Sequence, residues 1–413
     1  MKVKFLILLL MTGIFLSGNS VFSPLGTPLQ SYGNDVYGLG MGDTGISDLS
    51  RINCNQDNPS LLVSINKVTL STAVNMGYYW YKSETESYRD DELYLPFFML
   101  AVPIKDHRIG ISLSTVYSGN LYICQNGLTS TAGGDSLVYD EIIRKTEDLY
   151  RTSCHYAFKN SYLNIGFSMV YYFGNHINYW SLDFKDKEFT DSKYEYEKTY
   201  SGVSYKLGVS KTIGKFSLGA SYEPSAMLNG SLIYRYNFSP EEDTLQTDAD
   251  LYEVPENIKG GVTYMFSNTL KLNLESNIIF WSQTEDRYED SWRIAGGISY
   301  DPIAGYGRWY ESIPFRLGAS WSKLPFKSDG KEIDEMMLSA GSTIQLDSPG
   351  RKLDFAIRYL TRGNHEQSGY QDASLQLIIG VTGFDVFQKT PKRTADRDIP
   401  KVDPGMGVKE DTQ

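Results

Sequence analysis

The chain has 413 residues, a formal net charge of −11 and 41% hydrophobic residues. This negative charge argues against nucleic acid as a partner, because phosphate backbones bind basic surfaces. Three cysteines are too few for a disulfide framework in a chain of this length, although one pair could form. The 31 tyrosines, 37 glycines and 14% aromatic content suit β-sheets with one polar and one apolar face.

Residues 1–20 have the pattern of a secretory signal peptide. Lys2 and Lys4 make the start basic, residues 5–16 are apolar, and small or polar residues follow up to Ser20, after which we expect cleavage. The apolar run is too short to span a bilayer as a helix, and no later run is long enough either. The sequence therefore predicts an exported chain without a transmembrane helix.

The next segment, residues 21–65, contains a glycine-rich stretch. Residues 40–45, Gly-Met-Gly-Asp-Thr-Gly, match the G-x-G-x-x-G fingerprint of dinucleotide-binding proteins. That fingerprint needs a buried strand before it and an acidic residue about 20 positions after it. The preceding residues are rich in Pro, Gly and polar side chains, and residues 62–65 contain no carboxylate. We therefore reject a nucleotide site and predict no cofactor.

From Lys67 onward the sequence alternates with a period of two. In residues 162–173, for example, Leu163, Ile165 and Phe167 fall on one face, and Gly166 and Ser168 fall on the other. We count about 14 such segments of roughly 10 residues between residues 66 and 387, which is typical of a transmembrane antiparallel β-barrel of the outer membrane. The fold class we predict is therefore all-β.

Long and short gaps take turns between these segments. Residues 82–93 and 119–146 are long gaps, residues 105–106 and 159–160 are short turns, and residues 301–312 break the alternation. Outer-membrane barrels have short periplasmic turns and long outer loops. A soluble β-sandwich also alternates in hydrophobicity, but it has no reason to alternate its connections. This alternation of long and short connections predicts an even number of strands and both termini in the periplasm.

Strand after strand carries a glycine on its polar face. Glycine weakens a strand and is common where another backbone comes close, so these glycines could make room for a chain inserted in the barrel. Glycine kinks that help barrel closure are the alternative explanation. The glycines are Gly110, Gly166, Gly208, Gly219, Gly261, Gly297, Gly318, Gly341 and Gly380.

The predicted inward faces also carry charged side chains. A wet barrel interior can hold charges that lipid would not accept, and we expect them to pair with one another or with an inserted segment. They are Arg108, Arg151, Lys206, Lys259, Lys271, Arg293, Arg316, Arg358, Arg362, Glu223, Glu275 and Asp354.

The sequence predicts neither an enzyme nor a metal site. His107 falls in a short turn, His176 and His365 fall in long gaps, and only His155 lies on an inward face. No local signature of a Ser-His-acid site accompanies it, and no His/Cys cluster has metal-ligand spacing. The acidic stretch near Asp183 could bind Ca²⁺ weakly, but a solvated loop is the preferred interpretation. Residues 388–413, rich in Pro and charge, are expected to form a disordered periplasmic tail.

The stretch 38–42, Gly-Leu-Gly-Met-Gly, and the turn Asn58-Pro59-Ser60 resemble the start of the FadL family of outer-membrane transporters of hydrophobic compounds, and of PorV-like relatives. YEVPENIKGGVTYMF, from Tyr252, and ESIPFRLGASWSKLPF, from Glu311, are further similarities. The resemblance implies that residues 21–65 form a plug in the lumen, with Gly40, Gly42, Asn58 and Pro59 among its residues. It also implies that inward arginines could hold a fatty-acid carboxylate, with Arg316 and Arg358 as our candidates.

On this resemblance we expect passive uptake of hydrophobic small molecules, such as fatty acids, across the outer membrane. The alternative is a PorV-like barrel that serves protein secretion or surface attachment, with secreted proteins as partners. In either case we expect the partners to include outer-membrane lipid and the barrel assembly machinery.

Overall fold

The computed structural model describes residues 20, 22, 29–30, 35–83, 87–132, 135–186, 189–237, 243–248, 252–302, 313–328, 330–346 and 351–383. The predicted tail and all of the predicted signal peptide except Ser20 lie outside the described residues.

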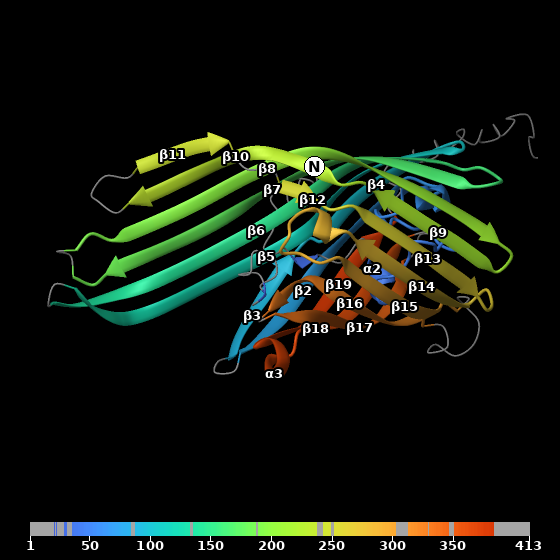
Figure 1. Cartoon of the computed structure of the whole chain (residues 1–413). Coiled ribbons are helices and arrows are strands. Elements are labelled where there is room, and N and C mark those ends of the chain that lie inside the picture. The colour runs from blue at the N-terminus through green and yellow to red at the C-terminus, as the bar shows by residue number, and fades with distance from the viewer. Residues whose placement is uncertain are drawn as a thin grey trace, which may run out of the picture.

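The strands form one closed antiparallel barrel with 14 wall positions, which confirms the predicted fold class (Figure 1). The wall closes because the last strand, β19, pairs with β2. Three of the wall positions are each formed by more than one strand. β3 and β4 share one position, β9 and β10 share the second, and β11, β12 and β13 share the third. The strands are β1 (Leu29–Gln30), β2 (Thr69–Ser83), β3 (Ser87–Tyr94), β4 (Phe97–Ile104), β5 (His107–Ala132), β6 (Asp135–Phe158), β7 (Asn164–Phe184), β8 (Ser192–Ile213), β9 (Phe216–Glu223), β10 (Ala226–Asn237), β11 (Asp243–Asp248), β12 (Tyr252–Val254), β13 (Asn257–Met265), β14 (Leu270–Ile279), β15 (Ser291–Tyr300), β16 (Phe315–Ser328), β17 (Lys331–Gln345), β18 (Lys352–Arg362) and β19 (Tyr370–Thr382).

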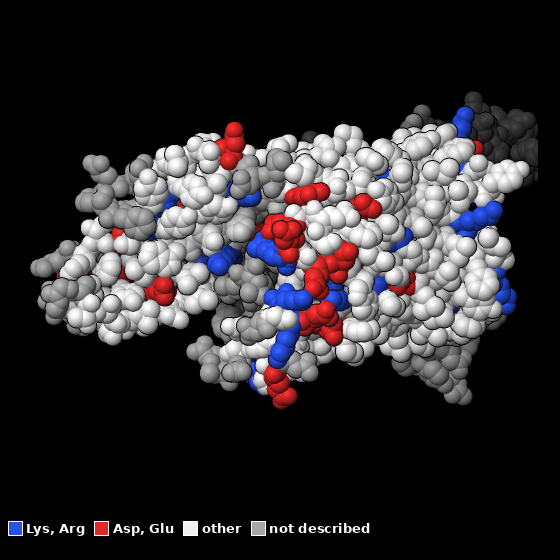
Figure 2. Space-filling view, viewed as in Figure 1, with Lys and Arg blue, Asp and Glu red and all other residues white. Residues whose placement is uncertain are grey.

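The two faces of the wall follow the predicted alternation. In β7, Phe167 is 42% exposed on the outside, whereas its neighbour Ser168 is fully buried inside. Apolar residues cover the outer face of every long wall strand, as in barrels that sit in a membrane. Figure 2 shows charged side chains gathered in a band across the middle of the molecule and at one end, with mostly uncharged surface between them.

Several predicted long gaps are folded as strand. β5 continues as a strand to Ala132, and β6 begins at Asp135 and returns beside it. β7, β8, β10 and β11 extend alongside these two strands. We call the described residues of these extensions the projecting sheet, because they stand out beyond the rest of the barrel (Figure 1). They are residues 119–132, 135–147, 174–186, 189–200, 229–237 and 243–248. A sheet that is solvated on both faces needs no apolar stripe, so the alternation that marks the wall strands fades here. We call this end of the barrel the projecting end, and the opposite end, with turns at 105–106 and 214–215, the turn end.

The amino-terminal segment threads the lumen. It holds the short helices α2 (Val36–Leu39) and η2 (Pro59–Ser64), whereas η3 (Trp281–Gln283) and α3 (His365–Ser368) lie in connections at the projecting end. No helix among the described residues is both long and apolar enough to cross a membrane.

The two ends of the described chain lie at opposite ends of the barrel. The Gly383 N–H donates to the Leu70 carbonyl at the turn end, over 2.9 Å. Ser20 instead bonds to Asp372, and the ring of Phe22 lies 6.0 Å from that of Phe326, both at the projecting end. The prediction that both termini face the periplasm stays a prediction, because these contacts place the described residues along the barrel and not relative to the two sides of a membrane.

Candidate functional site

The inward glycines lie against the amino-terminal segment. A Cβ at eight of the nine predicted positions would meet an atom of this segment, and only Gly110 faces wall residues instead. Successive parts of the segment meet successive strands around the wall. The series begins with Val36, which contacts Gly380, and ends with Ser60, which contacts Gly166. This matching of wall glycines to one inserted backbone favours the first of the two explanations, close approach, over barrel curvature.

Gly40 and Gly42 lie where the segment touches β16 and β17. A Cβ on Gly40 would be 3.0 Å from the Gly341 Cα, and a Cβ on Gly42 would be 2.7 Å from the Ala319 carbonyl oxygen. Gly42 also has φ +75°, a conformation that residues with side chains rarely adopt, and its N–H donates to the Ser339 hydroxyl over 2.8 Å. Gly42 therefore excludes a larger residue, whereas a side chain at Gly40 would require the backbone of β17 to shift by a few tenths of an ångström.

Asn58 and Pro59 form the other predicted contact, on β7 and β8. The Asn58 carboxamide oxygen accepts from the Ser60 N–H over 3.1 Å and so caps η2, with Pro59 at the first helical position. Its amide nitrogen donates to the carbonyls of Ile46 (2.9 Å) and Val209 (3.1 Å). One buried side chain thus fixes the turn to the segment and to the wall.

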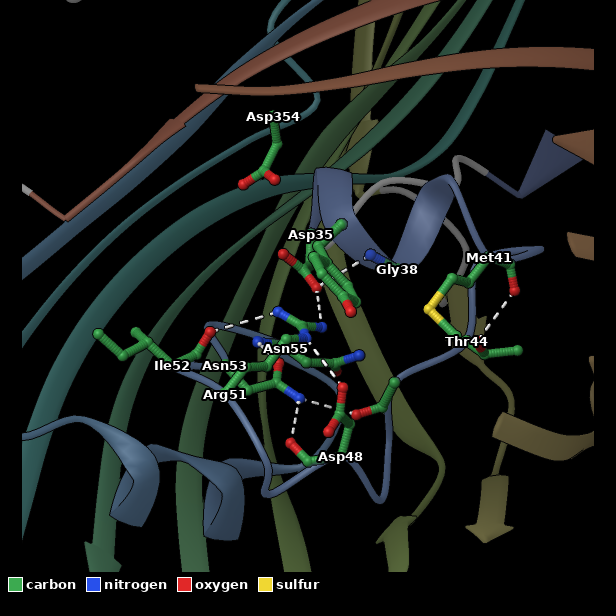
Figure 3. A network of polar contacts seen from close by, with 12 residues as sticks. Asp35, Gly38, Met41, Thr44, Asp48, Arg51, Ile52, Asn53, Asn55 and Asp354 are labelled. Atoms are coloured by element: carbon green, nitrogen blue, oxygen red, sulfur yellow. Dashed lines mark hydrogen bonds and ion pairs between the residues drawn. The ribbon is translucent and has the colours of Figure 1, made fainter. Parts of the chain in front are cut away.

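Tyr37 organises a polar cluster near the turn end. Its ring centroid lies 4.1 Å from each guanidinium carbon of Arg51 and Arg316, and 4.7 Å from the Lys271 ammonium. Arg51 lies between Asp35 and Asp48, as Figure 3 shows, and its Nε is 2.9 Å from Asp48. The cluster borders a cavity of about 550 Å³ that opens at the turn end and is lined mainly by polar residues.

Arg316 and Arg358 are both buried, but both have protein partners. Arg316 donates to Thr343 over 2.8 Å and pairs with Asp354 over 3.2 Å. Arg358 donates to the side chain of Gln376. Gly40 lies beside Arg316, since a Cβ on Gly40 would be 3.5 Å from the arginine Nε, whereas Asn58 and Pro59 lie on another part of the wall.

Asp57 is a partner that the sequence did not reveal. It pairs with three wall cations, Arg151 at 3.0 Å, Lys206 at 3.5 Å and Lys259. Lys206 also pairs with Glu223 over 3.0 Å. We call these five residues the Asp57 cluster. All are buried, and their three cations outnumber their two carboxylates.

Glu275 and Arg293 hold the glycine-rich turn from the β14–β15 side. Glu275 accepts from the N–H groups of Gly45 (3.0 Å) and Ile46 (3.1 Å). Arg293 donates to the Gly42 carbonyl. The signal that could have suggested these contacts is the charge balance, because the segment carries four Asp residues and the inward faces are mainly basic. The segment residues are Asp35, Asp43, Asp48 and Asp57.

The lumen changes character toward the projecting end. There, buried apolar and aromatic side chains form one cluster, which we call the apolar chamber. Tyr200 and Tyr252 stack at 4.9 Å, Tyr117 meets Trp281 at 5.4 Å, and Phe22 of the amino-terminal segment lies among them. The chamber comprises Phe22, Leu29, Tyr117, Leu149, Val170, Tyr172, Tyr200, Ala226, Leu228, Val254, Ile279, Trp281, Tyr288, Leu324, Phe326 and Ile333.

His155 is inward and buried, as predicted, and it bonds to two serines. Its Nε2 lies 2.7 Å from the Ser112 hydroxyl, and its Nδ1 lies 2.6 Å from the Ser168 hydroxyl. Within the described ranges, no group of three or more His, Cys, Asp or Glu residues is arranged to hold a metal ion.

The fold has known relatives. A FadL homologue from Pseudomonas aeruginosa aligns with a TM-score of 0.62 at 13% identity, over 87% of this chain and 100% of that one. The toluene transporter TodX of Pseudomonas putida aligns with a TM-score of 0.58 at 15% identity, over 86% and 98%. The monoaromatic hydrocarbon channel CymD gives 0.56 at 14%, over 85% and 97%. The predicted resemblance to the FadL superfamily is confirmed at the level of the fold, and the chain is a closed β-barrel of this type.

Sequence comparison adds the family. No curated protein matches the chain. The family model described as BamG matches residues 3–389, which includes the whole barrel. The chain therefore belongs to the BamG family.

Proposed function

We propose that this barrel lets hydrophobic small molecules, such as fatty acids, cross the outer membrane passively, with residues 21–65 as the plug that gates the lumen. The observation that carries the proposal is the apolar chamber. Porin lumens are polar and water-filled, whereas this lumen presents a buried aromatic and aliphatic surface at the projecting end. Structural relatives that are named as toluene and hydrocarbon channels support the same class of ligand.

Two side chains of the amino-terminal segment fill part of the apolar chamber and would act as the gate. Phe22 and Leu29 belong to the amino-terminal segment and pack among wall residues there. An apolar ligand can replace these two side chains without exposing the chamber to water, so ligand entry and movement of the segment are coupled. In this function the chain catalyses no reaction, residues 1–20 are removed on export, and residues 388–413 form a periplasmic tail.

The Asp57 cluster is a second candidate carboxylate site beside the predicted pair Arg316 and Arg358. Its three cations share Asp57 and Glu223 and so outnumber the carboxylates of the cluster, whereas Arg316 faces Asp354. A small cavity of about 30 Å³ borders Asp57, Arg151 and Lys259 and also Tyr117 of the chamber. A fatty acid in the chamber would then direct its carboxylate toward these cations.

Leu228 and Met227 give a matched test of the chamber. Leu228 is buried in the chamber, and its neighbour Met227 faces outward. We expect Leu228→Gln to weaken the binding of oleate or toluene, measured by calorimetry on purified protein, and to slow the uptake of radiolabelled oleate by cells. Met227→Gln should change neither. Equal effects of the two changes, at equal folded yield, would contradict the proposal.

One observation favours the alternative, a barrel that serves secretion or surface attachment. The projecting sheet extends well beyond the wall and carries no part of the chamber beyond Tyr200. Mass spectrometry of natively extracted protein would separate the two functions, because bound lipid supports the first and a stoichiometric protein partner supports the second.

A further inference from the structure

The projecting sheet leaves one long strand edge open. Beyond Ser118, and within the part of the chain that the structure describes, β5 pairs only with β6. Residues 119–125 pair regularly with 141–147, and a register shift follows between Gln125 and Leu128. Every second residue of this seven-residue stretch therefore presents its N–H and C=O groups toward the open edge, in a regular row.

This edge lacks the features that usually protect an edge strand. Residues 119–125, Gly-Asn-Leu-Tyr-Ile-Cys-Gln, contain no charge and no proline. Natural edges are kept short, charged or bulged, because a flat uncharged edge pairs with other chains. Tyr122 is 56% exposed, and Ile123 and Cys124 are exposed beside it.

Two other open edges among the described residues, those of β3 and β11, are protected. β3, which pairs only with β2 among the described residues, carries four consecutive charged residues at 89–92. β11, which pairs only with β10, is six residues long and has Asp at both ends. The uncharged edge of β5 is therefore a local exception within one molecule, which calls for an occupant.

The same edge already accepts an added strand. Leu29 and Gln30 of β1 pair antiparallel with Ser118 and Tyr117 of β5, immediately before the open row begins. Upstream of Leu29, Pro28 and Pro24 lack the N–H that a continued ladder needs, and Phe22 packs against Phe326 on another part of the wall. Among the described residues the open row therefore continues the edge that β1 occupies, and the two prolines disfavour its extension by the upstream sequence.

A second copy of the chain fits the edge poorly. Two copies in one membrane point the same way, so their β5 strands would run parallel to each other, and a two-fold axis would reverse the faces of the joined sheets. We propose that residues 119–125 of β5 bind an extended, uncharged segment of a different polypeptide at the projecting end, which adds to the sheet as an antiparallel strand.

Cys124 allows a direct test on the purified full-length protein. The probes are nine-residue peptides of alternating Thr and Val, each with one Cys placed at a successive position, used with a Cys154→Ser variant. Strand addition places alternate peptide side chains on the face of Cys124. We expect disulfide formation with Cys124 to rise and fall with a period of two along the series. A flat profile, or no disulfide, would overturn the proposal.

Methylation of the peptide backbone distinguishes binding by strand pairing from nonspecific hydrophobic binding. N-methylation of alternate peptide nitrogens removes main-chain donors and leaves every side chain in place. We expect it to lower disulfide formation roughly tenfold, because several hydrogen bonds are lost together. Tyr122→Lys should have a similar effect, since edge lysines oppose pairing. The control Leu245→Lys, at a side chain that is also 56% exposed but lies on β11, should have none. Equal effects of the two lysines would contradict the assignment to β5.

The partner is then sought in intact cells. A photo-reactive phenylalanine analogue at position 122 should give an adduct with a second polypeptide, and one at position 245 should not. Excess Thr-Val peptide should suppress the adduct, and its N-methylated form should leave it. An adduct with the mass of two copies of this chain, or one that the peptide does not suppress, would overturn the proposal.

Discussion

At Gly318 the wall and the inserted segment approach as closely as two backbones can. A Cβ there would overlap backbone atoms of Met41 and Gly42. Backbone atoms cannot move aside as the end of a flexible side chain can. We expect Gly318→Val to displace the segment while the wall, whose outer face is untouched, still assembles. The measurement is single-channel conductance in planar bilayers, which should increase.

Gly260 is the matched control for this change. It lies on β13, and a Cβ there would meet nothing within 4 Å. Gly260→Val should leave conductance at the level of the unmodified protein. If Gly318→Val is equally silent and both variants fold, the segment does not seal the lumen.

Asp57 shows how a single acidic residue can fix the segment. It faces three cations, and breaking a buried pair typically costs about 3–5 kcal/mol, because the remaining charge is left uncompensated. We expect Asp57→Asn to lower the denaturation midpoint, followed by heat-dependent mobility in gel electrophoresis. Glu285→Gln removes an exposed ion pair with Arg287 and should cost less than about 1 kcal/mol. A fall of similar size in both variants would show that the Asp57 cluster does not stabilise the protein.

These residues also mark what a sequence can predict. A glycine on the polar face of a strand indicates that another backbone comes close, even when that backbone is unknown. The sequence could therefore predict that these eight glycines contact an inserted segment. It could not predict which glycine meets which segment residue, because that depends on how the lumen folds the segment in three dimensions. For the same reason the sequence identified Lys206 and Lys259 as inward cations, but not Asp57 as their shared partner.

At the level of elements, the wall strands and the projecting sheet obey different rules. Wall strands have lipid on one side, so their alternation is strong and the register was predictable. The projecting strands mix Tyr, Lys, Glu and Asn on both faces, which in a single sequence is typical of a loop, and the prediction of long loops was wrong for this reason.

Arginine at equally exposed leucines tests this division. Leu338 lies in the middle of β17 and is 51% exposed, and Leu245 lies on β11 of the projecting sheet at 56%. Arginine near the bilayer midplane costs about 2–4 kcal/mol. We expect Leu338→Arg to reduce the folded fraction in the outer membrane and Leu245→Arg to leave it unchanged. Comparable losses would place both leucines in the same environment.

Ser168 is a poor control for its neighbour Phe167 within β7. The alternation predicts that Phe167→Arg impairs assembly, because Phe167 faces outward, and that Ser168→Arg is milder, in a water-filled interior. Ser168 is in fact fully buried and bonded to His155, so an arginine there would disturb the packed lumen. The projecting sheet provides the solvated comparison that the interior does not.

For the molecule as a whole, the wall and its contents are held by separate interactions. The wall closes through β19 and β2, and among the described residues of the amino-terminal segment only β1 joins its hydrogen-bonded ladder. The segment is held instead by ion pairs, by capped turns and by contacts with wall glycines. A closed β-barrel without its plug keeps all of its strand pairing, since no edge is exposed by the loss.

Removal of residues 30–58 tests this separation. We expect the shortened chain to reach the outer membrane and to close, because β2 and β19 are intact, and to conduct more than Gly318→Val does, because the whole lumen is then open. It should also unfold at a lower temperature, since Lys206, Lys259 and Lys271 lose their partners on the segment, although water in the open lumen offsets part of that loss. A deletion variant that fails to assemble, while Gly318→Val assembles normally, would show that the segment is needed to build the wall as well as to fill it.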